Sequence, residues 1–122
     1  MTDLAHIEFF EEYLPGFIGK ALIPNLFSVS TAFTIDLGQE ELGRWGLAIE
    51  KGTLTEIRSG GIADGSFTFR LGPDTFLKIV SGEQNPQMAF FTGKVKIDGD
   101  MIQALKIATV LSEFFTKYPY KA

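Results

Sequence analysis

Residues 85–101 of the chain read NPQMAFFTGKVKIDGDM and carry the signals of two helices and a strand in close succession. Pro86 suits the first position of a helix and Gly93 suits its end, so a short helix is predicted between them. Alternating apolar residues over 95–97 predict a strand. The Asp-Gly-Asp triplet at 98–100 then predicts a turn whose last aspartate caps a further helix.

The segments that flank this stretch are also predicted to be helical. From Met101 to about Lys117, apolar residues occupy nearly all sides of a helix. Such a helix must be buried on most of its sides, so we expect it inside the fold. Residues 74–80 place apolar side chains at helical spacing, and Gly82 is suited to end that helix.

Nearer the N-terminus, apolar and polar residues alternate in four segments, which predicts four more strands. These segments cover residues 30–37, 44–50, 54–58 and 66–71. Together with the strand at 95–97, they give five predicted strands that are interrupted by helices only after residue 73.

The first segment of the chain, residues 4–21, spaces its apolar side chains three and four residues apart, which predicts a helix. Thr2 or Asp3 is expected to cap this helix. Pro15 is costly inside a helix, so we expect a break or kink near Leu14 and a second short helix over about 16–22.

The composition fits one domain over residues 1–122 and excludes several classes of protein. Twelve phenylalanines exclude disorder, and the lack of cysteine excludes a disulfide scaffold or a cysteine-ligated metal site. The net charge of −4 argues against nucleic-acid binding, although residues 94–122 hold five lysines and three acids. No apolar run reaches the length of a membrane span and no signal peptide is evident, so a soluble cytoplasmic protein is expected.

Motifs for catalysis and cofactor binding are missing. His6 is the one histidine, so sites built on two or more histidines are excluded. Glycine-rich nucleotide loops, nucleophile elbows and calcium loops are absent as well. We therefore expect no metal, no cofactor and no enzymatic activity. The alternative is an enzyme that acts on a lipid with Asp36 or Asp100 as its base.

Taken together, residues 74–101 resemble the sterol carrier protein two family. The resemblance rests on a short helix ending in Ser81-Gly82, on Asn85-Pro86, and on an Ala-Phe-Phe helix followed by Gly-Lys-Val-Lys-Ile-Asp-Gly-Asp. It implies an α+β fold in which a five-stranded, mostly antiparallel sheet is covered on one side by helices, with an apolar tunnel between them. It also implies a free-standing, non-catalytic carrier of fatty acids, fatty acyl-CoA, sterols or phospholipids.

The resemblance also indicates which residues face the tunnel. Phe90, Phe91 and Met101 match family positions that face the interior or the tunnel, and Leu105 and Ala108 share one face of the last helix. Ala108 replaces a glutamine that many relatives carry, which puts a polar anchor for a lipid headgroup there in doubt. The full set of residues expected to contact lipid is Phe10, Tyr13, Leu14, Phe17, Phe33, Trp45, Phe90, Phe91, Met101, Leu105 and Ala108.

Two alternatives to a free lipid carrier stay open at this point. The protein could hold a polyprenyl, quinone or other lipid intermediate for a biosynthetic enzyme complex, or its tunnel could be filled by its own phenylalanines. A lipid-metabolising enzyme is one expected partner. A membrane surface is another, contacted transiently by the last helix through Lys106, Lys117, Lys121, Phe114, Phe115, Tyr118 and Tyr120.

Overall fold

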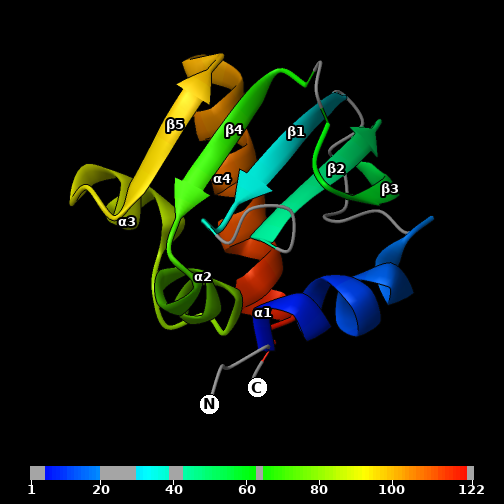
Figure 1. Cartoon of the computed structure of the whole chain (residues 1–122), viewed down its shortest axis with the longest axis horizontal. Coiled ribbons are helices and arrows are strands. Elements are labelled where there is room, and N and C mark those ends of the chain that lie inside the picture. The colour runs from blue at the N-terminus through cyan, green and yellow to red at the C-terminus, as the bar shows by residue number, and fades with distance from the viewer. Residues whose placement is uncertain (1–4, 20–29, 39–42, 63–64, 121–122) are drawn as a thin grey trace.

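A computed structural model of the chain describes residues 5–19, 30–38, 43–62 and 65–120 (Figure 1). Its strands are β1 (Thr31–Asp36), β2 (Arg44–Glu50), β3 (Thr53–Ser59), β4 (Phe67–Leu71) and β5 (Val95–Gly99). They form one sheet in the order β3-β2-β1-β4-β5. β1 and β4 pair in parallel and the other neighbours are antiparallel, so the sheet is mixed but mostly antiparallel, as predicted.

The segment after β3 explains why β1 and β4 are parallel in a sheet whose other neighbouring strands are antiparallel. β1, β2 and β3 follow one another as antiparallel neighbours. The chain then crosses the sheet through residues 60–62, where the Ile62 amide donates a hydrogen bond to Thr34 Oγ1 at 2.9 Å. Ile62 lies directly over Gly46, where no side chain would fit. This crossing brings the chain to the open edge of β1, where β4 pairs in the same direction as β1.

The helical segments are α1 (Ala5–Glu8), a π-helical turn η1 (Phe9–Tyr13), a 3-10 turn η2 (Leu14–Phe17), α2 (Pro73–Val80), α3 (Pro86–Phe91) and α4 (Met101–Lys117). The bounds of α2, α3 and α4 agree closely with those predicted. Asn85 caps α3 by accepting a hydrogen bond from the Gln87 amide at 2.8 Å. Asp100 caps α4 by accepting one from the Gln103 amide at 3.1 Å.

The N-terminal helix changes from a π-helical to a 3-10 turn between Tyr13 and Leu14, at the place where a break or kink was predicted. Pro15 lies in the first turn of η2, where its missing N–H costs no helical hydrogen bond. After Phe17 the backbone is extended, with Ile18 at φ −61° and ψ 131°. The prediction of a second helix is therefore wrong at Ile18, while residues 20–22 and the predicted caps lie outside the described residues.

The helices lie on one face of the sheet, and the core fills the space between the two layers (Figure 1). Phe10 of η1 stacks between Trp45 of β2 and Phe76 of α2, with ring centroids 4.9 and 5.2 Å away. On the sheet itself, Phe33 stacks on Phe67 of the neighbouring strand at 4.9 Å. The ring stacks join the N-terminal helix, α2 and the sheet into one core.

The opposite face of the sheet is polar. Asp36 of β1 forms ion pairs with Arg44 at 3.8 Å and with Arg70 at 3.6 Å, and Arg70 also pairs with Asp98. Solvent-exposed ion pairs contribute at most about 1 kcal/mol each. Residues 60–62 cover this face at Thr34 and Gly46, and the ion-paired arginines beside them are exposed, while the helices cover the other side of the sheet, as predicted.

Gly99 is the position where the fold most directly requires glycine. Its φ is +105°, and a Cβ placed there would lie 2.6 Å from the Ser66 carbonyl oxygen and 2.8 Å from Phe67 Cα. Gly99→Ala is expected to lower the free energy of unfolding by roughly 1–3 kcal/mol from backbone strain alone, and the close contacts add to this loss. Urea denaturation measures the change. Gly16→Ala, where no atom lies within 4 Å, is the control, and equal losses in both variants would contradict this explanation.

Candidate ligand cavity

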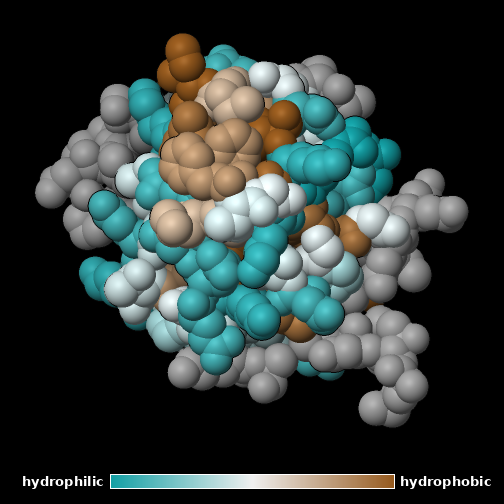
Figure 2. All heavy atoms as spheres, turned by 90° about the vertical axis from the view of Figure 1, so that its left-hand side faces the viewer, coloured by the Kyte–Doolittle hydropathy of each residue, from teal (hydrophilic) through white to brown (hydrophobic). Residues whose placement is uncertain are grey.

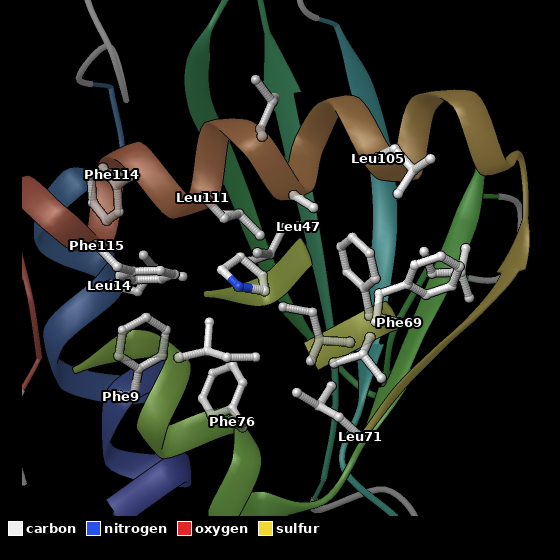
Figure 3. A pocket seen from close by; sticks show the side chains of 18 of the residues that line it. Phe9, Leu14, Leu47, Phe69, Leu71, Phe76, Leu105, Leu111, Phe114 and Phe115 are labelled. Carbon is white, nitrogen blue, oxygen red and sulfur yellow. The ribbon is translucent and has the colours of Figure 1, made fainter. Parts of the chain in front are cut away.

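An apolar cavity of about 50 Å³ lies between α4 and the helix-covered face of the sheet (Figure 3). Strand residues form its floor, and α4, the N-terminal helix, α2 and α3 supply the walls. The lining residues are Phe9, Leu14, Ile35, Leu47, Ile49, Leu54, Phe69, Leu71, Phe76, Ile79, Pro86, Phe90, Val95, Ile97, Leu105, Ala108, Leu111, Phe114 and Phe115.

Every side chain of this lining is aliphatic or aromatic. The described part of the wall therefore offers no side-chain charge, hydrogen bond or metal ligand to a bound molecule. Apolar burial is then the main source of binding free energy, and it depends on contact area and not on direction. The cavity suits hydrocarbon, and its chemistry gives little selectivity for polar groups.

Residue spacing explains why these side chains converge. Residues of β1, β2 and β4 that face the helices alternate with residues on the polar face, which brings Ile35, Leu47 and Phe69 onto the floor. In α4 the inward-facing residues recur at steps of three or four, as on one side of a helix. Leu105, Ala108, Leu111 and Phe115 follow this spacing, and Phe114 also lines the cavity.

Phenylalanine rings narrow the cavity. Phe9 of η1 lies 5.4 Å from Phe76 of α2 and 5.7 Å from Phe115 of α4, measured between ring centroids. Figure 3 shows these three rings together near Leu14 at one end of the cavity. Pockets that hold drug-sized ligands typically measure about 300–1,000 Å³. The described conformation is thus a closed one, in which a long chain fits only after lining side chains move.

The structure brings together four of the residues predicted to contact lipid, since Leu14, Phe90, Leu105 and Ala108 line the cavity. Phe10, Phe33 and Trp45 are buried in the core beside it. Tyr13 and Phe17 pack against the core from outside and are half-buried. The Tyr13 hydroxyl donates a hydrogen bond to the Tyr118 carbonyl at 3.2 Å, and burial raises the pKa of Tyr13 above its ordinary value.

The prediction that Phe91 and Met101 face the interior is wrong. Phe91 is 74% exposed and Met101 is 41% exposed. Adjacent residues of a helix point about 100° apart, so α3 turns Phe90 toward the cavity and Phe91 toward solvent. Met101 lies where the chain turns from β5 into α4, and a large part of its side chain remains in solvent.

Most residues of the cavity floor are absent from the set predicted from the sequence. The floor residues Ile35, Leu47 and Phe69 lie on the same face of the sheet as Phe33. Alternation alone gives two faces per strand and does not say which face meets the helices. The strand order and register, which are properties of the folded sheet, were needed to select it.

The two aspartates of the alternative enzyme hypothesis lie away from the cavity. Asp36 is on the polar face of the sheet, and Asp100 is occupied as the cap of α4. In the part of the chain that the structure describes, no group of three or more His, Cys, Asp or Glu residues is placed to hold a metal ion. Neither aspartate of the alternative enzyme hypothesis therefore reaches the lining.

The predicted membrane contact through Phe114 and Phe115 is also wrong. Both side chains are buried, at 2% and 5% exposure, because they line the cavity instead of facing outward. Tyr118 is 38% exposed and Tyr120 is half-buried, while Lys121 lies outside the described residues. Among the described helices, none combines the length and the apolar character needed to cross a bilayer.

Comparison with known protein families agrees with this architecture. The model of the SCP-2 sterol transfer family matches residues 23–112. The chain belongs to the SCP-2 sterol transfer family. The match includes every strand and the cavity-lining part of α4 up to Leu111, and it begins after the N-terminal helix.

Curated relatives of the SCP-2 family include both short and long proteins. Sterol carrier protein 2 of Arabidopsis thaliana is 30% identical over 107 residues, which cover 84% of this chain and 83% of that protein. Hydroxysteroid dehydrogenase-like protein 2 of Xenopus tropicalis is 33% identical over 87 residues. Those residues cover 66% of this chain but 19% of that protein, so the likeness is to one part of a longer chain.

Solved structures of the SCP-2 family share the fold. A crystal structure of sterol carrier protein 2 has a TM-score of 0.68 at 13% identity and covers 93% of this chain and 95% of that one. Palmitated SCP2L2 from Aedes aegypti has a TM-score of 0.62 at 24% identity, with 85% and 92% covered. The ubiquinone synthesis protein UbiJ-SCP2 has a TM-score of 0.61 at 11% identity, with 93% and 94% covered.

Proposed function

We propose that the protein binds one lipid with a long hydrocarbon portion in the cavity and carries it in the cytoplasm without changing it chemically. The observation that carries this proposal is the lining, which is apolar throughout. Family membership supports it, and so does the palmitated state of a structure with the same fold. Fatty acids, fatty acyl-CoA, sterols and phospholipids all have an apolar portion that suits such a wall.

Hydrocarbon burial supplies enough free energy for reversible binding. A chain of about 16 carbons contributes on the order of 12 kcal/mol at roughly 0.8 kcal/mol per methylene. Association costs about 4–15 kcal/mol in lost freedom and ordering. The difference permits affinities up to about the micromolar range without any polar contact. One methylene changes the affinity by only about 1–3 kcal/mol, so several related lipids are expected to bind.

Native mass spectrometry of protein purified without delipidation tests the proposal. We expect a population of molecules heavier by the mass of one lipid, and we expect organic extraction to remove that mass. After extraction and refolding, a fluorescent fatty acid should bind saturably at micromolar protein. Absence of both the adduct and saturable binding would contradict the proposal.

A second candidate function is to hold a polyprenyl or quinone intermediate for a biosynthetic enzyme complex. The observation that favours it is the common fold with the ubiquinone synthesis protein UbiJ-SCP2. Isoprenoid chains are also apolar throughout, so the same lining suits them. The mass of the native adduct distinguishes the two functions, since an isoprenoid chain grows in five-carbon steps and a fatty acyl chain in two-carbon steps. Co-purification of biosynthetic enzymes would further favour the second function.

A further inference from the structure

An apolar patch lies exposed on α3 and the first turn of α4. Within the described residues, six large apolar side chains are exposed, and four of them belong to this patch: Met88 (56%), Phe91 (74%), Met101 (41%) and Ile102 (79%). Figure 2 shows tan and brown atoms gathered in one area of the face that carries α3 and β5, bordered by hydrophilic atoms. Exposed patches of this kind on soluble domains mark contact surfaces. We call these four residues the α3–α4 patch.

The patch and the cavity are built from the same elements. Phe91 lies 5.7 Å from the ring of Phe90, which lines the cavity. Met101 lies one helical turn before Leu105, which is another lining residue. α3 packs against both α4 and β5 at this end of the molecule. A thin layer that includes Phe90 and Leu105 therefore separates the cavity from the exposed patch.

Basic residues accompany the patch. Residues 86–109 contain Lys94, Lys96 and Lys106 and the two acids Asp98 and Asp100, although the whole chain carries −4. Asp98 is paired with Arg70, and Asp100 caps α4. Lys106 lies one turn after Ile102 on α4, and Lys94 lies three residues after the end of α3. All three lysines are exposed, but Lys96 is the register partner of Arg70 and lies on the polar face of the sheet, so Lys94 and Lys106 are the positive charges that accompany the patch.

We propose that the α3–α4 patch inserts into the surface of an anionic lipid bilayer and that lipid passes between bilayer and cavity through the layer at Phe90 and Leu105. This rests on the proposed lipid-carrier function. The apolar side chains of the patch can enter the hydrocarbon region of such a bilayer. The lysines beside them can contact its negatively charged headgroups. Passage at the docked face keeps the hydrocarbon chain out of water during transfer.

Flotation with vesicles tests the docking step without reference to the cargo. Wild-type protein is expected to bind vesicles of phosphatidylcholine containing phosphatidylserine. The double variant Phe91→Gln/Ile102→Gln should bind them at least about tenfold more weakly, because two apolar side chains no longer enter the bilayer. The matched control is Ile18→Gln, which makes the same change at an exposed isoleucine (44%) outside the patch and should bind as wild type does.

The lysines test the electrostatic part. Lys94→Gln and Lys106→Gln should each weaken binding to the phosphatidylserine vesicles by about fivefold, since a lysine near an anionic surface contributes about 1 kcal/mol. The same variants should not change binding to vesicles of phosphatidylcholine alone. Equal effects on both kinds of vesicle would overturn the assignment of an anionic surface.

Fluorescence measurements separate docking from cargo binding. Neither Phe91 nor Ile102 lines the cavity, so the double variant should bind a fluorescent fatty acid at equilibrium as wild type does, while its rate of transfer between vesicles falls at least about tenfold with docking. If wild type floats with vesicles but binds no fatty acid, the carrier function fails and the passage step fails with it.

Three results would overturn docking by the patch. The first is unchanged flotation of the double variant, and the second is an equal loss in the Ile18→Gln control. The third is a wild-type dimer in light scattering that the double variant dissociates, together with no binding of wild type to vesicles. That last result would assign the patch to contact with a second copy of the chain.

Discussion

Ala108→Phe is expected to weaken fatty-acid binding by about 100-fold while the protein stays folded. Ala108 lies in the middle of the inward stripe of α4, and its small side chain leaves part of the cavity open. A phenyl ring at this position takes the space of three or four methylenes of the ligand, which removes roughly 2.5–3 kcal/mol of binding free energy. The measurement is a titration with a fluorescent fatty acid, with circular dichroism to establish that the variant is folded.

Thr116→Phe is the matched control for this experiment. It adds the same ring to an exposed position of the same helix, so binding should equal that of wild type. Ala108→Leu, with a smaller side chain, should give an intermediate loss. Wild-type affinity in a folded Ala108→Phe protein would show that lipid does not bind in this cavity.

Phe10→Ala is expected to lower the free energy of unfolding by about 3–5 kcal/mol, which is the range for large-to-small changes in a well-packed core. Phe10 is 1% exposed and stacks on both Trp45 and Phe76, so its loss separates η1 from β2 and from α2. Urea denaturation followed by tryptophan fluorescence reports on this site directly, because Trp45 is the one tryptophan of the chain.

The control for Phe10→Ala is Phe91→Ala, which makes the same chemical change at a side chain that is 74% exposed. Substitutions at exposed positions usually change stability by no more than about 0.5 kcal/mol. A similar loss in both variants would contradict the role of the three-ring stack in holding the N-terminal helix on the sheet.

The secondary structure after residue 30 was predictable because residues that start or end an element act on their immediate neighbours in the sequence. Asn85 with Pro86, and Asp100 at the start of α4, are helix starts that act through their own backbone neighbours. Pro15 likewise indicated the change in the helix at Leu14, but it did not show that the helical backbone ends at Phe17. The change to a 3-10 turn, which accommodates Pro15, is set by packing in the folded protein.

The cavity was harder to predict because its lining is a property of the assembled layers. Phe90 and Phe91 are alike in sequence, yet the orientation of α3 places one on the wall and the other in solvent. Ile35 and Phe69 carry no sequence signal that separates a cavity floor from an ordinary core. Strand register and helix placement determine which residues line the cavity, and the local sequence pattern predicts neither of them.

A wall made only of hydrocarbon also affects how such a protein changes over evolutionary time. A receptor with buried hydrogen bonds needs matched substitutions when its ligand changes, because an unpaired polar group costs about 1–3 kcal/mol. The described lining side chains, such as Leu105 and Leu111, form no such pair, and exchanges between apolar residues of similar volume usually cost less than about 1.5 kcal/mol. Descendants of one ancestral chain can thus acquire different cargoes through single substitutions while the sheet and its helices stay the same.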